Sequence, residues 1–128
     1  MTGGETDLSR LIRDLEPRLD PEIFVFVCIQ DDPPPSLKPF ATVREREGLT
    51  LVITENEAAA LALEGGFPCR RISLGVHSAL DAVGLLARLT TALAAEGISV
   101  NAFSGTYHDH LLVPTGQAER ALNILDNL

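Results

Sequence analysis

The stretch DAVGLLARLTTALAAEGISVNAFS, residues 81–104, decides the fold. Its first part has Ala and Leu at helical spacing, which predicts an amphipathic helix over residues 81–96 that ends at a glycine. Residues 98–104 alternate between apolar and polar side chains, which predicts a strand. The unusual residue is Gly84, which falls in the first turn of the predicted helix and would let a ligand or another backbone come close.

The sequence on either side predicts the rest of an α+β unit. Residues 69–77 alternate as a strand, and residues 107–113 predict a second strand after a turn at 104–106. Apolar residues at helical spacing over 118–125 predict a final helix. This β-α-β-β-α order lacks one strand of the split βαββαβ, or ferredoxin-like, unit. The apolar run at residues 22–30, or an edge of the first half, could supply that strand.

The first half predicts similar elements in the order α-β-β-β-α. In chain order these are a helix over 7–16, a strand over 22–30 buried on both faces, a stiff proline-rich loop over 31–39, a hairpin over 40–54 that turns at Gly48, and a helix that ends at Gly65-Gly66. Thr54 and Glu57 have the spacing of a capping box at the start of that last helix. We therefore predict two α+β lobes, residues 1–66 and 67–128, with antiparallel sheets and helices on one face.

Topology brings several polar residues of the second lobe together. A right-handed crossover makes strands 70–77 and 98–104 parallel, with strand 107–113 between them and antiparallel to both. The loop at 78–84, His77 and the turn at 104–108 then share one end of the sheet. A helix N-terminus at that end offers unpaired N–H groups to an anion.

A zwitterionic amino acid suits this end of the sheet, with its carboxylate on the helix amides and its ammonium on Asp81 or Asp109. The residues alone leave a structural alternative open. In that alternative Asp81 is an ordinary N-cap, and Gly84 only allows close packing of helix and strand.

The same residues resemble the ACT-domain pattern of an acidic residue, a glycine, a leucine-rich helix, a second glycine and an I-x-V-N strand. They are Asp81, Gly84, Leu85, Leu86, Gly97, Ile98, Val100 and Asn101. The longer stretches RISLGVHSALDAVGLLARL and YHDHLLVP resemble small bacterial tandem-ACT proteins, and FATVREREGLTLVIT (40–54) is similar to the first lobe of that group. That first lobe lacks the glycine-bearing loop and the first crossover helix of a complete ACT domain.

The resemblance implies tandem ferredoxin-like lobes and a regulatory, non-enzymatic role. It implies that an amino acid binds at the loop before the first helix of the C-terminal lobe and at the neighbouring second strand, with no cofactor. Together with the topology, it makes the predicted ligand site His77, Ser78, Ala79, Leu80, Asp81, Val83, Gly84, Asn101, Ser104 and Asp109. A regulated enzyme would be a separate chain, and pairing of edge strands predicts a homodimer.

Two other interpretations remain open from the residues. His77, His108 and His110 fall near the same sheet end and could bind Zn²⁺, although H-x-H on a strand equally suits hydrogen bonds that fix the hairpin and the loop. The chain could also be a protein-interaction module without a small ligand.

Composition excludes several partners. The net charge is −8 and no basic run occurs, so nucleic acid and anionic membranes are not expected partners. No apolar run approaches the length of a membrane span and the first 20 residues lack a signal-peptide core, so we expect a cytoplasmic protein. Cys28 and Cys69 lie far apart in strand-like stretches, which predicts two buried, inert thiols.

Overall fold

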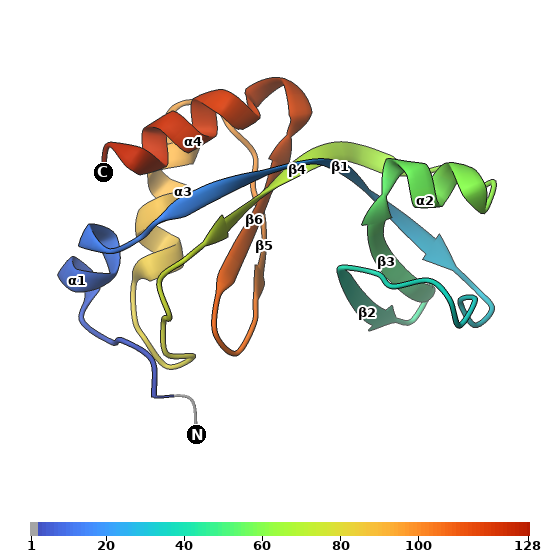
Figure 1. The fold of residues 1–128 in the computed structure, drawn as a ribbon, viewed down its shortest axis with the longest axis horizontal. Helices are drawn as coiled ribbons and strands as arrows, with labels where there is room; N and C mark the ends of the chain where they lie inside the picture. Colours follow the sequence, from blue (N-terminus) through green and yellow to red (C-terminus); the bar gives the residue numbers. More distant parts are fainter. Residues whose placement is uncertain (1–2) are drawn as a thin grey trace. The chain divides into compact units, whose positions relative to one another are not determined.

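The computed structural model describes residues 3–128 (Figure 1). The chain forms two compact units, one from residues up to 21 together with 70–128, and the other from residues 22–69. The elements in chain order are α1 (Leu8–Arg13), β1 (Pro17–Ile29), β2 (Ala41–Glu45), β3 (Gly48–Thr54), α2 (Glu55–Ala60), β4 (Gly66–Leu74), α3 (Leu85–Ala95), β5 (Asn101–Ser104), β6 (Asp109–Pro114), a 3-10 turn (Thr115–Gln117) and α4 (Ala118–Asp126).

The unit of residues 22–69 has the strand order β2-β3-β1-β4. Strand β3 is antiparallel to both neighbours, with Thr54 opposite Phe24 of β1 and Val52 opposite Ala41 of β2. One sheet face packs with α2 around a core of Val25, Val27, Leu51, Ile53 and Ala58. This is the strand order of a ferredoxin-like unit. Residues 30–40 contain no helix, so the predicted absence of a first crossover helix is confirmed for this unit.

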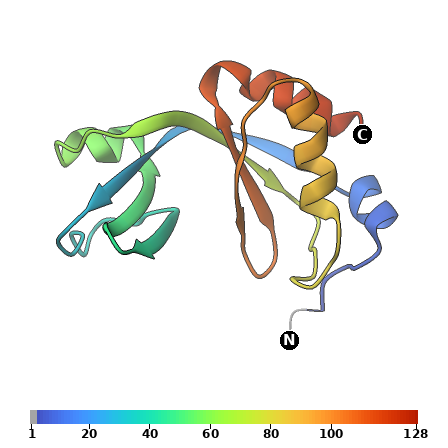
Figure 2. The same ribbon diagram turned by 180° about the vertical axis from the view of Figure 1, so that it is seen from behind.

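The other unit has the order β1-β4-β6-β5. Strand β6 lies between β4 and β5 as predicted, and Ser104 of β5 is opposite Asp109 of β6. Residues 17–21 of β1 supply the strand that the second half lacks. Helices α1, α3 and α4 contribute to one core on one face of this sheet (Figure 2), which includes Leu11, Leu15, Ile72, Leu74, Leu89, Leu111 and Ala121. Both units thus have the predicted ferredoxin-like, α+β architecture.

The compact units do not follow chain order. Residues 3–21 belong with the C-terminal half because Leu11 and Leu15 are buried in its core. The predicted lobes, 1–66 and 67–128, divide the chain sequentially, and that boundary stays a prediction. Within residues 3–128, no helix combines the length and the apolar composition that crossing a membrane requires.

Several predicted boundaries were wrong. The capping box is confirmed, because Glu57 N donates to Thr54 Oγ1 at 3.1 Å and Thr54 N donates to Glu57 Oε1 at 2.8 Å. The helix that it starts nevertheless ends at Ala60, and Ala62 takes the left-handed position with φ +55° while Leu63 N bonds Ala58 O at 2.9 Å. Gly65 serves close packing instead, since a Cβ there would lie 2.5 Å from Val25 Cβ.

The remaining differences concern element ends. The helix predicted over 7–16 is confined to α1, the strand predicted over 22–30 begins at Pro17, and the hairpin turns at residues 46–47, one step before Gly48. Strand β4 covers Gly66–Leu74 where 69–77 was predicted, β5 covers Asn101–Ser104 where 98–104 was predicted, and β6 covers Asp109–Pro114 where 107–113 was predicted. Cys69 is buried as predicted, but Cys28 is exposed. Cys28 lies on the opposite face of β1 from the buried Val27 and close to the end of the strand. A side chain at a strand end has fewer neighbours to bury it than one in the middle of the strand.

Candidate functional site

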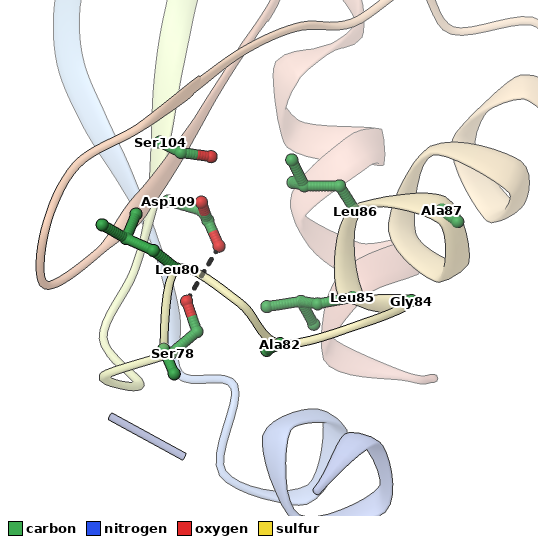
Figure 3. Close-up of a pocket in the computed structure, with 10 residues that line it drawn as sticks. Ser78, Leu80, Ala82, Gly84, Leu85, Leu86, Ala87, Ser104 and Asp109 are labelled. Atoms are coloured by element: carbon green, nitrogen blue, oxygen red, sulfur yellow. Dashed lines mark hydrogen bonds between the residues drawn. The ribbon is translucent and has the colours of Figure 1, made fainter. Parts of the chain in front are cut away.

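A cavity of about 160 Å³ lies where the loop after β4 meets the start of α3 and the adjacent ends of β5 and β6 (Figure 3). Its lining residues are Ser78, Ala79, Leu80, Ala82, Gly84, Leu85, Leu86, Ala87, Ser104 and Asp109. The loop, the helix start and the two strand ends are therefore brought together as the topology predicted.

The N-terminus of α3 faces this cavity without a side-chain cap. Gly84 is the N-cap, with φ +97°, and the first helical hydrogen bond runs from Arg88 N to Gly84 O at 2.9 Å. The amides of residues 85–87 consequently have no partner within the helix. A Cβ on Gly84 would meet only Leu8 Cδ2, at an ordinary 3.4 Å. The glycine is thus required for its left-handed backbone, and close packing of helix and strand does not require it, which corrects that structural alternative.

A buried hydroxyl–carboxylate pair forms the opposite wall. Ser78 Oγ donates to Asp109 Oδ2 at 3.0 Å, and the two residues are only 5% and 7% exposed. Figure 3 shows this bond crossing between the loop and the start of β6. A buried carboxylate beside a cavity is a strong acceptor for a cationic or N–H donor group.

The segment before α1 forms backbone hydrogen bonds with the loop after β4. Glu5 N donates to His77 O and Ala79 N donates to Glu5 O, each at 2.9 Å, in a short parallel bridge. A Cβ on Gly4 would lie 2.5 Å from Ala79 N, so a larger residue does not fit in this arrangement. No sequence pattern indicated this contact, because it pairs backbone groups more than 70 residues apart.

Six of the ten predicted ligand residues line the cavity, namely Ser78, Ala79, Leu80, Gly84, Ser104 and Asp109. Asp81 does not, and the prediction that it could cap the helix was wrong because the helix starts at Leu85 and Asp81 is exposed. Val83 is 83% exposed. Asn101 is exposed at the other end of β5 from Ser104. The prediction missed Ala82, Leu85, Leu86 and Ala87, because it started the helix at residue 81.

The histidines act separately. His110 Nδ1 shares a hydrogen bond with Ser73 Oγ at 2.7 Å, His108 Nδ1 bonds Val76 O at 3.3 Å, and the His77 ring packs on Tyr107 with centroids 4.9 Å apart. Within residues 3–128, no three potential metal ligands come close enough to hold an ion, so the alternative zinc site at His77, His108 and His110 is not formed. The hydrogen-bonding interpretation of the His-Asp-His segment is confirmed.

Comparison with known families and structures agrees with the fold. One ACT-domain family matches residues 3–70, and a second matches residues 67–127. The chain belongs to the ACT-domain family and has two such domains in tandem. ACT domains are in general regulatory modules that bind small molecules.

Among solved structures, a protein of unknown function from Vibrio cholerae, VC0802, described as a possible transport protein, is 40% identical with a TM-score of 0.83 and covers 91% of each chain. Atu0741 from Agrobacterium tumefaciens is 18% identical with a TM-score of 0.74, over 88% of this chain and 87% of that one. The regulatory subunit of aspartate kinase from Thermus flavus is 14% identical with a TM-score of 0.64, over 88% and 95%. The last two share the fold. The comparison with functionally curated proteins gave no match.

Proposed function

We propose that this protein is a non-enzymatic regulatory module that binds a free amino acid at the N-terminus of α3 in its C-terminal ACT domain. The observation that carries the proposal is that an uncapped helix start and the buried carboxylate of Asp109 line the same small cavity. A zwitterionic amino acid matches these two features, because its carboxylate suits the helix N-terminus and its ammonium suits Asp109.

In the proposed complex, the ligand carboxylate accepts from the free amides of residues 85–87, where the helix dipole also favours an anion. The ammonium donates to Asp109, beside the Ser78 hydroxyl. The ligand side chain lies among apolar groups of Leu80, Ala82 and Leu86. A volume of about 160 Å³ favours a small amino acid, since sites for drug-sized ligands occupy ~300–1,000 Å³.

The lining also supports a binding role over catalysis. Asp109 is the one carboxylate among the ten lining residues, and none of them is His, Lys or Cys. A nucleophilic mechanism at Ser78 needs a base that accepts its proton and a group that orients that base. The Ser78 hydroxyl donates to Asp109, and the lining holds no His or second carboxylate that would orient Asp109 as such a base.

A homodimer is part of the proposal. Leu80 lines the cavity and is 67% exposed, and Val83 on the same loop is 83% exposed. A second copy placed over this loop would bury both side chains and close the ligand site. Sedimentation equilibrium with and without ligand tests this step, and a monomer under both conditions overturns it.

Thermal denaturation in the presence of each of the twenty amino acids tests the binding proposal. A ligand present at 100 times its Kd adds about 2.7 kcal/mol to the free energy of unfolding, a shift of several degrees in Tm. No shift with any amino acid overturns the proposal.

Two isosteric variants then locate the ligand. Asp109→Asn removes the charge and keeps an acceptor for Ser78, so we expect the ligand-induced shift to disappear. Asp81→Asn is the matched control, because it removes a carboxylate of the same loop that does not line the cavity. Equal ligand shifts in the two variants contradict the assignment of Asp109.

A further inference from the structure

A second and larger cavity, of about 420 Å³, lies in the unit of residues 22–69. It is bounded by the end of β1, the loop of residues 30–40 and the segment after α2. Its apolar lining includes Ile29, Leu37, Leu51, Leu61 and Leu63. It shares no lining residue with the amino-acid site, so a role for this cavity is independent of the proposed function.

The cavity occurs where a helix is missing from the fold. In the unit that contains residues 70–128, the crossover from β4 to β5 contains α3, which buries Leu85, Leu89 and Leu93 in the core. The unit of residues 22–69 has the corresponding strand order, but its first crossover, from β1 to β2, is the helix-free loop of residues 30–40. From that loop, Leu37 packs against the core that includes Leu51.

Backbone hydrogen bonds hold two of the turns that line the cavity. Leu37 N donates to Pro34 O at 3.0 Å in the proline-rich loop, and Leu63 N donates to Ala58 O at 2.9 Å after α2. Leu37 and Leu63 are partly buried against Leu51, which is fully buried. The cavity is therefore a groove with apolar side chains between two hydrogen-bonded turns.

The charge at the groove determines what fits it. Asp31 and Asp32 line one end and are exposed, and none of the lining residues is basic. The whole chain has a net charge of −8, so a second copy would bring further negative charge to this end. A cationic partner is complementary.

We propose that the groove binds an amphipathic helix of another protein, with an apolar stripe flanked by Lys or Arg. The helix occupies the position left by the missing crossover helix. Its apolar side chains at i, i+3, i+4 and i+7 enter the groove, and its basic residues lie at Asp31 and Asp32.

Fluorescence anisotropy with a labelled synthetic helix tests the proposal. The probe is a 16-residue peptide with Leu at i, i+3, i+4 and i+7 and Lys on both flanks of that stripe. Its control is a scrambled peptide of identical composition without the stripe. We expect saturable binding of the probe and at least tenfold weaker binding of the scrambled peptide. Equal binding of both overturns the proposal.

Charge-matched variants locate the interaction. Asp31→Asn with Asp32→Asn should weaken binding of the probe about tenfold at low salt. Glu47→Gln with Glu64→Gln changes the net charge equally at exposed residues outside the lining, and should leave binding unchanged. Equal weakening by both pairs means general attraction to an acidic chain, and overturns the proposal.

Amide chemical shifts of the wild-type protein provide a test that needs no variant. On addition of the probe, we expect the largest changes at the amides of Ile29, Leu37, Leu61 and Leu63. Changes spread over the whole chain overturn the proposal. So do changes of these same amides on raising the protein concentration alone, since a second copy would then occupy the groove.

Discussion

The hydroxyl of Ser78 donates to the carboxylate of Asp109 at 3.0 Å, across 31 residues of sequence and in a nearly solvent-free setting. The bond joins the loop after β4 to the first residue of β6. It therefore fixes the loop and aims a carboxylate at the cavity. One contact thus connects the stability of the loop with the chemistry of the proposed ligand site.

Ser78→Ala should destabilise the protein by about 1–3 kcal/mol, because it leaves a buried carboxylate without its donor. Ser104→Ala removes a hydroxyl from the same cavity at an exposed position and should change stability by less than about 0.5 kcal/mol. Urea denaturation of both variants measures the difference. Similar losses for the two would show that the Ser78 bond does not hold the loop.

Gly84→Ala should cost about 1–2 kcal/mol, because a Cβ at φ +97° is strained by its own backbone. The surroundings do not add to this cost, as the nearest side-chain atom would be at an ordinary contact distance. Gly116→Ala is the control, since no atom lies within 4 Å of its Cβ position and its φ is not in the left-handed region. Equal changes in Tm would contradict the backbone explanation.

The fold could be predicted because its signals are local or topological. Periodicity located most elements, the right-handed crossover placed β6 between its neighbours, and the Thr54–Glu57 capping box needs only four consecutive residues. Even the incomplete first lobe was predictable, since consecutive prolines after β1 exclude a helix there.

The site could be predicted only in part, for two physical reasons. Ala82 continues the helical spacing of the leucines, so the pattern extends the helix past the true N-cap and cannot reveal that Gly84 is left-handed. The contact of Glu5 with the loop uses backbone atoms alone, and such contacts leave no trace in side-chain patterns. The prediction that Cys28 is buried was wrong for a related reason. An alternating pattern does not show how close a residue lies to the end of its strand, where fewer neighbours cover it.

The partly buried imidazole of His110 should make the free energy of unfolding depend on pH. Burial lowers its pKa from the usual 6.5, and the Arg71 cation and His108 add to this shift, while Asp109 opposes it. As the pH falls, His110 is therefore protonated in the unfolded chain before it is protonated in the native protein. The free energy of unfolding consequently falls as the pH decreases below about 6.5. His110→Gln should flatten the decline that the wild-type protein shows between pH 7 and 5. Denaturant midpoints at several pH values measure both slopes, and an unchanged slope in His110→Gln would count against this assignment.

The two thiols should react very differently in the native protein. Cys69 is fully buried, its Sγ donates to Phe24 O at 3.4 Å, and burial raises its pKa to about 11. At pH 8 only about one Cys69 in a thousand would be thiolate even with solvent access. Cys28 is exposed and should be the thiol that reacts with Ellman's reagent, while Cys69 should react only after unfolding in urea.

Single variants check this assignment and connect it to the groove. Native Cys28→Ser should show no fast-reacting thiol, and Cys69→Ser should keep one. Because Cys28 lines the groove beside Asp31 and Asp32, the amphipathic probe peptide should also slow its labelling, and the scrambled peptide should not. Two fast thiols in the native wild-type protein would mean that the strand pairing around Cys69 opens readily. A labelling rate of Cys28 that saturating probe leaves unchanged would place the bound helix away from the end of β1.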